Sequence, residues 1–209
     1  ICYRIYQEPY IIHYSIRKTE RASQIETDLK TIRQKGYLLD GLVTDGGKGV
    51  VTAAKKVFPF TPHQICLAHM HRQAIVGLGR KPKDYRSLRL RQLADHLFLI
   101  ESREALAWWL NELKVWGRVH RDYLVEKGHD EYAGKSWFKH KNARKTLRVL
   151  LHTSQSSFTF LRHPLMPKTT NGIEGVFSNL RIKWQIHKGL KQHRWENFLQ
   201  WFIYFRNLQ

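Results

Sequence analysis

Strand-like patterns are confined to the first 70 residues of this 209-residue chain, and helical periodicity dominates the rest. In the first part, short runs of aromatic and β-branched residues alternate with amphipathic segments, which is typical of strands alternating with helices. The predicted elements are, in order, strands over 2–6 and 10–16 with Glu8 and Pro9 between them, a helix from the N-cap Thr19 to Gly36, a strand over 38–44, a helix over 50–57 that ends before Pro59, and a strand over 63–67.

The chain from about residue 69 to 160 has helical periodicity, most clearly over 104–123, where leucine, tryptophan and tyrosine recur on one broad face. Pro164 and Pro167 interrupt this pattern, and a last helical segment covers residues 173–208. The order of elements predicts an α/β fold in which a mixed sheet is interrupted by a large helical insertion.

Composition narrows the class of protein further. With 42% hydrophobic and 12% aromatic residues, the chain has enough apolar side chains for a buried core, which argues against overall disorder. No stretch of eighteen uncharged apolar residues occurs, so we expect no membrane span. Two cysteines cannot form a disulfide framework, and their scarcity favours a reducing compartment such as the cytoplasm.

Basic residues are in large excess and gather toward the C-terminus. The chain holds 36 Lys and Arg against 17 Asp and Glu, and residues 132–209 hold 14 basic residues against two acids. This excess favours a polyanionic partner, most simply nucleic acid, over a basic surface that is only solvated. The tract 181–194 has five formal positive charges and no acid, so we expect it to contact DNA phosphates, the alternative being a solvated helix face. The expected contacts are Arg181, Lys183, Lys188, Lys191 and Arg194, with Trp184 and His187 as stacking side chains.

Asp45 follows a predicted buried strand and precedes a glycine-rich turn and a helix. Because ligand sites in open α/β sheets gather at the carboxyl ends of strands, an acid there is well placed for function. The alternative is that Asp45 only caps the following helix, because Asp-Gly is also a turn signal. Asp40, the other acid nearby, falls before the end of the strand and points to the opposite face of a regular strand.

Glu174 stands alone in a strongly basic region, because residues 132–173 contain eight Lys or Arg and no acid. A single carboxylate at the start of a helix, among basic groups that hold a polyanion, suits a metal ion bound next to a phosphate backbone. The alternative is a first-turn Glu stabilised by the helix dipole, a contribution of about 0.3–1 kcal/mol. The residues Thr-Thr-Asn at 169–171 supply the helix cap in either case.

The metal that these acids fit best is Mg²⁺, which prefers oxygen ligands and takes one or two carboxylates together with substrate phosphates. A two-metal site normally needs at least three carboxylates, and Asp45 and Glu174 provide two. Cys66 and His69 resemble half of a zinc site, but no second Cys/His pair follows at a suitable spacing. We therefore expect Cys66 to pack in an apolar strand, with His69 hydrogen-bonded near the end of that strand.

Four segments, taken in order, resemble the middle and the C-terminal part of Mutator-type (MULE-like) DDE transposases. The resemblance covers essentially the whole chain. It is strong because the segments occur in the order of the family and a helical block lies between the third segment and the fourth. The segments are Thr44–Gly49 (TDGGKG), Val57–Pro59 (VFP), Gln64–Arg72 (QICLAHMHR) and Thr169–Arg181 (TTNGIEGVFSNLR).

The resemblance implies an RNase H-like (integrase-like) catalytic domain with a triad of acids. Asp45 matches the second acid and Glu174 the third, both as metal ligands, while Cys66 and His69 match the C/D-x-x-H signature and Asn171 a supporting position. The implied organisation is a first core part over 1–70, an all-helical insertion over 71–168 and a C-terminal core part over 169–209. The implied cofactor is a pair of Mg²⁺ (or Mn²⁺) ions, and the implied partners are terminal inverted repeats, target DNA and a second copy of the chain.

The chain departs from the family at the first acid, which in the family lies on the first strand. Residues 1–18 contain no Asp, and Glu8 sits in a predicted turn, so we expect a truncated form that lacks this strand. Two alternatives to an active transposase remain open on the sequence: an inactive DNA-binding remnant, and an RNase H-like nuclease that cuts without joining. For His69 we leave two roles open, orienting a phosphate or a water molecule and a purely structural one.

Overall fold

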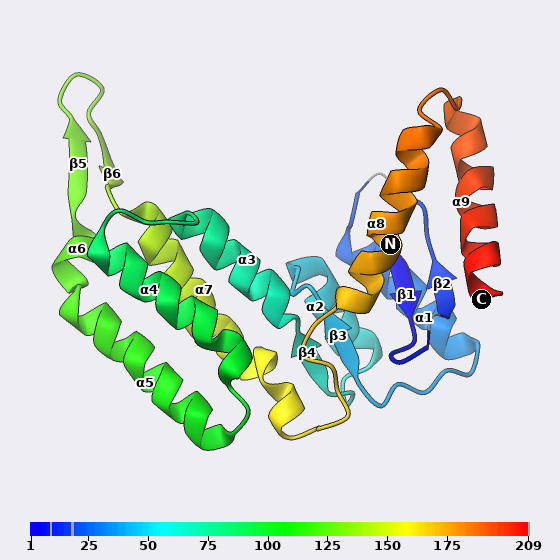
Figure 1. Cartoon of the computed structure of the whole chain (residues 1–209), viewed down its shortest axis with the longest axis horizontal. Coiled ribbons are helices and arrows are strands. Elements are labelled where there is room, and N and C mark those ends of the chain that lie inside the picture. The colour runs from blue at the N-terminus through cyan, green and yellow to red at the C-terminus, as the bar shows by residue number, and fades with distance from the viewer. Residues whose placement is uncertain (9, 18, 209) are drawn as a thin grey trace. The chain divides into compact units, whose positions relative to one another are not determined.

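The computed structural model describes residues 1–8, 10–17 and 19–208, and for residues 153, 155 and 192 it describes the backbone alone. The fold is α/β and mostly helical (Figure 1). The elements are β1 (Cys2–Arg4), β2 (Ile11–Tyr14), α1 (Ala22–Gln34), β3 (Leu42–Thr44), α2 (Lys48–Val57), β4 (His63–Ile65), α3 (Leu67–Leu78), α4 (Tyr85–Asp95), the 3₁₀ helix η1 (His96–Leu99), α5 (Arg103–Val119), α6 (Arg121–Val125), β5 (Lys127–Asp130), β6 (Lys135–Phe138), α7 (Lys141–Ser157), the 3₁₀ helix η2 (Thr159–Leu161), α8 (Asn171–Ile186) and α9 (Gln192–Asn207).

The chain divides into two compact units. Unit 1 combines Ile1–His63 with Thr170–Gln209, and unit 2 is Gln64–Thr169. Unit 2 thus contains the expected insertion over 71–168 but begins at Gln64. None of the helices in the described part of the chain combines the length and the apolar character that crossing a membrane requires.

The strands differ from the expected single mixed sheet. Within the described residues they form three two-stranded sheets, β1–β2, β3–β4 and β5–β6. Each strand has only three or four residues, so each pair has a short ladder of backbone hydrogen bonds, which is a poor basis for a wider sheet. The β1–β2 pair is antiparallel, with a register irregularity between Tyr3 and Arg4. The predicted break between these strands includes Pro9, which lies outside the described residues.

The core of unit 1 is the interface between α1 and α2. Apolar residues recur at three- and four-residue spacing on α1, which is why this segment forms an amphipathic helix. The face of α2 that carries small side chains packs against these residues. The buried residues are Ile25, Leu29, Ile32, Ala53, Ala54 and Val57. The expected N-cap Thr19 is wrong: the helix begins at Ala22 with Arg21 as its cap, where the Gln24 side chain accepts a hydrogen bond from the Arg21 N–H at 3.3 Å. The helix ends as predicted before Gly36, whose φ is +86°.

A buried carboxylate joins α1 to the β1–β2 sheet. Asp28 is 2% exposed, and its two oxygens accept hydrogen bonds from Ser15 Oγ (2.6 Å), Arg17 Nη2 (2.9 Å) and Tyr3 Oη (3.3 Å). Burial raises the pKa of Asp28, but the hydrogen bonds from Ser15, Arg17 and His13 together outweigh it, so the pKa lies below its ordinary value. Burial and the neighbouring Asp28 raise the pKa of Tyr3, which remains a neutral donor.

We expect Asp28→Asn to destabilise unit 1 at neutral pH by roughly 1–3 kcal/mol, because the charged hydrogen bonds from Ser15 and Arg17 are lost. Since the folded-state pKa is lowered, this contribution is fully present above the ordinary carboxyl pKa and is lost as the pH falls through that value toward the folded-state pKa. Denaturant unfolding of the wild type and the variant at several pH values measures the difference. A difference that stays constant from neutral to acid pH contradicts the assignment.

Asn207, the last residue of α9, binds the backbone of β2 with its side chain. The Asn207 amide accepts a hydrogen bond from the Ile11 N–H (2.9 Å) and donates one to the Ile11 carbonyl (3.0 Å), so it pairs with the backbone as a neighbouring strand would. The expected continuous helix over 173–208 is instead two helices, α8 and α9. The chain turns at His187–Leu190, where Gly189 lowers helix propensity.

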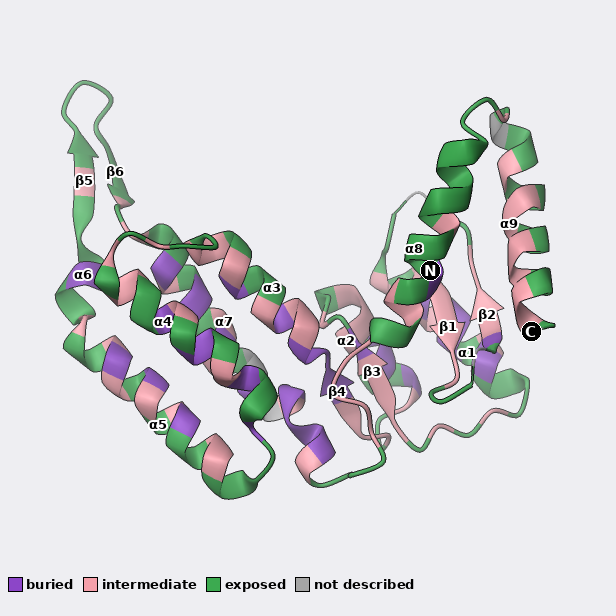
Figure 2. Cartoon of the chain, viewed as in Figure 1, coloured by how far each residue is buried: buried purple, intermediate pink, exposed green. Residues whose placement is uncertain are grey.

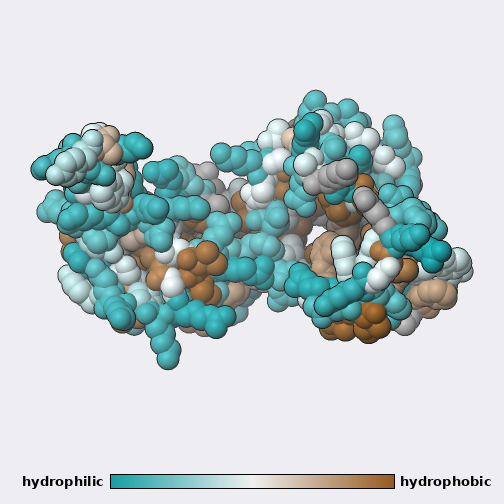
Figure 3. Space-filling view, turned by 90° about the horizontal axis from the view of Figure 1, so that it is seen from above, coloured by the Kyte–Doolittle hydropathy of each residue, from teal (hydrophilic) through white to brown (hydrophobic). Residues whose placement is uncertain are grey.

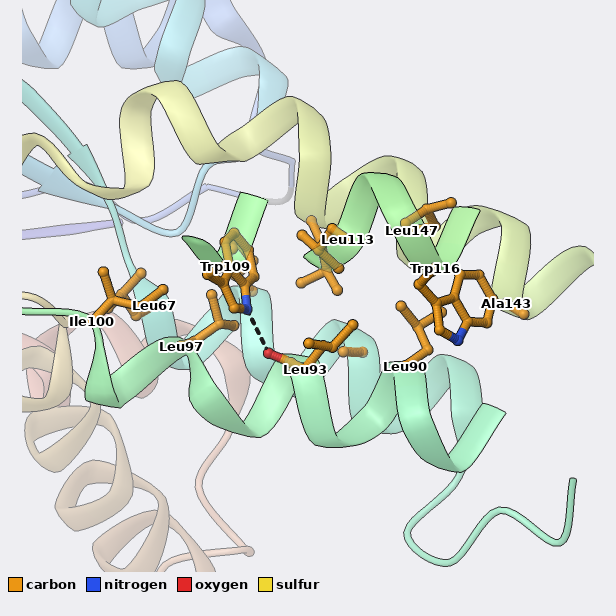
Figure 4. Packing of buried hydrophobic residues seen from close by; sticks show 14 of the residues in the cluster. Leu67, Leu90, Leu93, Leu97, Ile100, Trp109, Leu113, Trp116, Ala143 and Leu147 are labelled. Atoms are coloured by element: carbon orange, nitrogen blue, oxygen red, sulfur yellow. Dashed lines mark hydrogen bonds between the residues drawn. The ribbon is translucent and has the colours of Figure 1, made fainter. Parts of the chain in front are cut away.

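Unit 2 is a helical unit with a large apolar core (Figure 4). Buried residues from α3, α4, α5 and α7 pack around Trp109 and Trp116, which confirms the predicted apolar face of the 104–123 segment. In Figure 2 the buried positions lie on the inward sides of these helices. The expectation that 71–168 is all-helical is wrong, because β5 and β6 form an antiparallel hairpin in its middle, in register from Lys127↔Phe138 to Asp130↔Lys135.

Candidate functional site

Asp45 lies directly after β3, in a turn that leads into α2. The Thr44 hydroxyl fixes the start of this turn, because it accepts a hydrogen bond from the Gly46 N–H (3.2 Å) and contacts His63 Nε2 at 2.8 Å. Burial, together with the charge of Lys55, lowers the pKa of His63, so its ring is neutral near pH 7. Gly46 has a φ of +83°, a conformation that residues with a Cβ seldom adopt.

The Asp45 carboxylate is exposed and shares its oxygens between two roles. Oδ1 accepts a hydrogen bond from the N–H of Gly47, the N-cap of α2, at 2.9 Å. This is a side-chain turn contact and not a helix cap: the N-cap of α2 is Gly47, and no side chain caps this helix, so the capping alternative for Asp45 is wrong. Oδ2 accepts no hydrogen bond from the described residues, so it faces solvent and is open to a cation. The turn therefore orients the carboxylate without using both of its oxygens.

Glu174 lies in the first turn of α8, with Thr170 as the N-cap, as the sequence predicts. Its side chain is partly buried. Two residues earlier, Gly172 faces the guanidinium of Arg4 from β1, and a Cβ at this position would overlap Arg4 Nη1. The glycine therefore lets a cationic side chain lie against the turn that carries Glu174. Asn171 is the exposed first residue of the same helix.

Arg4 was not among the residues that the sequence singled out. Its Nε atom is buried and has no hydrogen-bond partner among the described residues. Arg4 and Gly172 are far apart in the sequence. Gly172 lies in the segment Thr169–Arg181, but neither its spacing nor its charge pattern indicates Arg4 as a neighbour. The only signal for a close backbone approach was the glycine after Asn171, which on its own is ambiguous.

Cys66 is not in a strand, contrary to expectation. β4 ends at Ile65 and Cys66 is the N-cap of α3, which begins at Leu67, where the N–H donates to the Lys168 carbonyl at 3.0 Å. His69 consequently lies in the first turn of α3 rather than near the end of a strand. Cys66 is fully buried, and its Sγ and a ring nitrogen of His69 lie within 4.8 Å of each other.

The basic tract 181–194 covers the end of α8, the turn and the start of α9. Residues 181–189 are all exposed (Figure 2), and hydrophilic residues cover most of the face seen in Figure 3. Trp184 packs against Trp195 of α9 with ring centroids 4.2 Å apart, and His187 meets Phe198 edge-on at 5.5 Å. These aromatic pairs hold the two helices together at the turn. Trp184 remains 48% exposed, so one face of the indole is still accessible.

The donor atoms available in unit 1 suit a hard cation. Asp45 and Glu174 offer carboxylate oxygens, which Mg²⁺ and Mn²⁺ prefer, and Asp45 Oδ2 is not engaged by the described protein groups. Both acids belong to unit 1, one after β3 and one in the first turn of α8. That their carboxylates meet around a metal stays a prediction.

A family model described as "Transposase, Mutator family" matches residues 8–131, which is more than half of the chain. The chain belongs to the Mutator family of transposases. Membership makes DNA its partner and DNA transposition its role. The match includes Asp45, Cys66 and His69, whereas Glu174 and the tract 181–194 lie beyond its end. Comparisons with curated proteins and with solved structures give no match.

Proposed function

We propose that this Mutator-family chain forms an RNase H-like DDE catalytic domain that cleaves DNA and joins its strands with Mg²⁺ or Mn²⁺. The observation that carries the proposal is Asp45, an acid at the end of a strand, in a glycine-shaped turn, inside the matched family segment. Glu174 supplies the second carboxylate from the first turn of α8. Together they hold the metal, which activates the attacking oxygen and stabilises the leaving oxygen when bound.

The roles of the surrounding residues follow from their charge and position. Arg4 places a guanidinium beside the first turn of α8, where it binds a phosphate group of the DNA backbone. Lys188 and Lys191 stand in the exposed turn between α8 and α9, where they contact the phosphate backbone. Asn171, Cys66 and His69 are supporting residues in this proposal.

The decisive experiment incubates the chain with Mg²⁺ and a duplex that carries the terminal repeats of its own element, and resolves the products on a denaturing gel. Strand-transfer products support the proposal. Nicks without joining identify an RNase H-like nuclease, and metal-independent binding without any product identifies a DNA-binding remnant. Either of the last two results overturns the proposed activity.

Charge reversal at Lys188 and Lys191, in the turn between α8 and α9, tests the proposed phosphate contacts separately from catalysis. We expect Lys188→Glu with Lys191→Glu to weaken duplex binding and to lower the slope of log K against log salt by about 2, because each lost phosphate contact removes about 0.9 from the slope. Fluorescence anisotropy at several salt concentrations measures the slope. Reversal of Lys30 and Lys35 on and after α1 serves as the control, and an unchanged slope in the Lys188/Lys191 variant indicates that the tract is only solvated.

A further inference from the structure

Unit 2 carries a basic surface on α7. Lys141, Lys145 and Arg148 follow one another at helical spacing, so they share one face of the helix, and all three are exposed. None of them forms an ion pair with an acid of the described chain. No acid occurs between residues 132 and 173, so the charge of this face is not compensated locally.

A β-ribbon, defined as the β5–β6 hairpin, projects from the end of unit 2 at which α7 begins (Figure 1). Its residues are almost all exposed, including Lys127 and Lys135. Trp137 lies across the backbone of Gly128, where a Cβ would meet the indole at 2.7 Å, so the ribbon stays thin at this point. At the tip, Asp130 accepts hydrogen bonds from the N–H groups of Tyr132 and Ala133, both at 3.1 Å.

Contacts at the junction between the ribbon and α7 hold the two elements together, so that they form one continuous surface. The Arg144 guanidinium lies over the Phe138 ring at 4.0 Å, and the Lys139 N–H donates to the Glu126 carbonyl at 3.0 Å. The Glu126 carboxylate is paired with Lys139 (2.8 Å) and His140 (2.9 Å). The acid at the base of the ribbon is therefore neutralised by its own neighbours.

The positive charge of this region comes from α7. A cavity of about 250 Å³ lies at the start of α7, where Lys139, His140 and Lys141 line it together with residues of α3, α4 and α6, and no described residue of β5 or β6 does. Lys139 is paired with Glu126, whereas Lys141 forms no ion pair with an acid of the described residues. The ribbon itself carries as many acids, Asp130 and Glu131, as lysines, so α7 supplies the charge that favours a polyanion.

We propose that double-stranded DNA binds to this surface, with phosphates on the Lys141, Lys145 and Arg148 face of α7 and the β-ribbon in the major groove. The major groove is about 12 Å wide and admits a two-stranded ribbon. The family match ends at residue 131, within the tip of the ribbon, so β6 and α7 lie outside it. This surface does not overlap the tract 181–194 in sequence. The proposal depends on the proposed function in one respect only, that the chain is a DNA-binding transposase.

The first test compares two triple variants of the full chain in duplex binding at several salt concentrations. Lys141→Gln, Lys145→Gln and Arg148→Gln together should lower the salt slope by about 2–3 and weaken binding by at least about tenfold at low salt. The matched control is Lys114→Gln, Arg118→Gln and Arg121→Gln, which removes the same charge from exposed positions of α5 and α6. Equal slopes in the two triple variants overturn the proposal, provided that circular dichroism shows both to be folded.

The second test uses the wild-type chain, so it does not depend on the variants folding. Lysine acetylation with and without a DNA duplex, read by mass spectrometry, should show protection of Lys127, Lys135, Lys141 and Lys145 but not of Lys114. Protection of the α7 lysines without those of the ribbon overturns the placement of the ribbon in the groove. A wild type that binds no duplex refutes both this surface and the proposed function, whereas duplex binding without protection in unit 2 refutes this surface alone.

Discussion

Asp45→Asn and Glu174→Gln are each expected to weaken Mn²⁺ binding by about a hundredfold and to abolish metal-dependent DNA joining. Each variant keeps the size of the side chain but replaces a charged carboxylate oxygen by an amide nitrogen, which repels the cation. The Asp45 turn should survive, because the asparagine carbonyl still accepts the hydrogen bond from the Gly47 N–H. Titration of Mn²⁺ followed by electron paramagnetic resonance measures binding independently of activity.

Two other acids of unit 1 provide matched controls for these variants. Asp40 is exposed before β3, and Glu196 is exposed on α9 in the same basic region as Glu174. We expect Asp40→Asn and Glu196→Gln to leave Mn²⁺ binding unchanged. Loss of binding in only one of the Asp45 and Glu174 variants indicates that the two acids do not share a metal, which removes the basis of the two-carboxylate site.

Helices were predictable where their pattern is local. The α1 and α2 segments and the apolar face of α5 follow from residue spacing alone, because a helix buries one face whatever its partner is. The Asp45 turn was predictable for the same reason, since Asp-Gly-Gly defines a turn within three residues. The helix start at Ala22 was missed because Thr19 is also a good N-cap residue, and tertiary packing decides between such candidates.

The features that depend on long-range contacts were not predictable. Asp28 looks like an ordinary exposed acid of an amphipathic helix, and only the approach of β1 and β2 makes it a buried acceptor. The β5–β6 ribbon lacks the β-branched residues that mark strands, so its lysine, histidine and serine residues read as loop or helix. The Arg4–Gly172 contact joins two distant segments that carry no shared pattern.

The same limit applies to the candidate site. Local pattern places Asp45 after a strand and Glu174 in a first helical turn, and the structure has both acids there. Whether two carboxylates meet depends on how β3 and α8 pack, which no local pattern encodes. For Cys66 the local pattern is misleading. The apolar run around it ends β4 and begins α3, and no polar residue marks the boundary between the strand and the helix.

Trp109→Ala is expected to destabilise unit 2 by about 3–5 kcal/mol, the range for removing a buried tryptophan. Trp109 is fully buried, and its Nε1–H donates to the Leu93 carbonyl at 2.7 Å (Figure 4). Leu93 lies in the last turn of α4, so the variant also removes a hydrogen bond to a carbonyl near the end of that helix. An edge-on contact with Phe158 at 5.7 Å is lost as well.

Hydrogen exchange of the α4 and α5 amides is the suitable measurement, because a chain of two units does not have to unfold in a single step. We expect the free energy of opening of these amides to fall in the Trp109 variant, while the α1 and α2 amides of unit 1 keep theirs. Trp108→Ala is the matched control, since the neighbouring indole is 53% exposed and its removal should cost less than about 0.5 kcal/mol. Equal protection in the two variants contradicts the role of Trp109 as the centre of this core, and a simultaneous loss of protection in α1 and α2 indicates that the units unfold together.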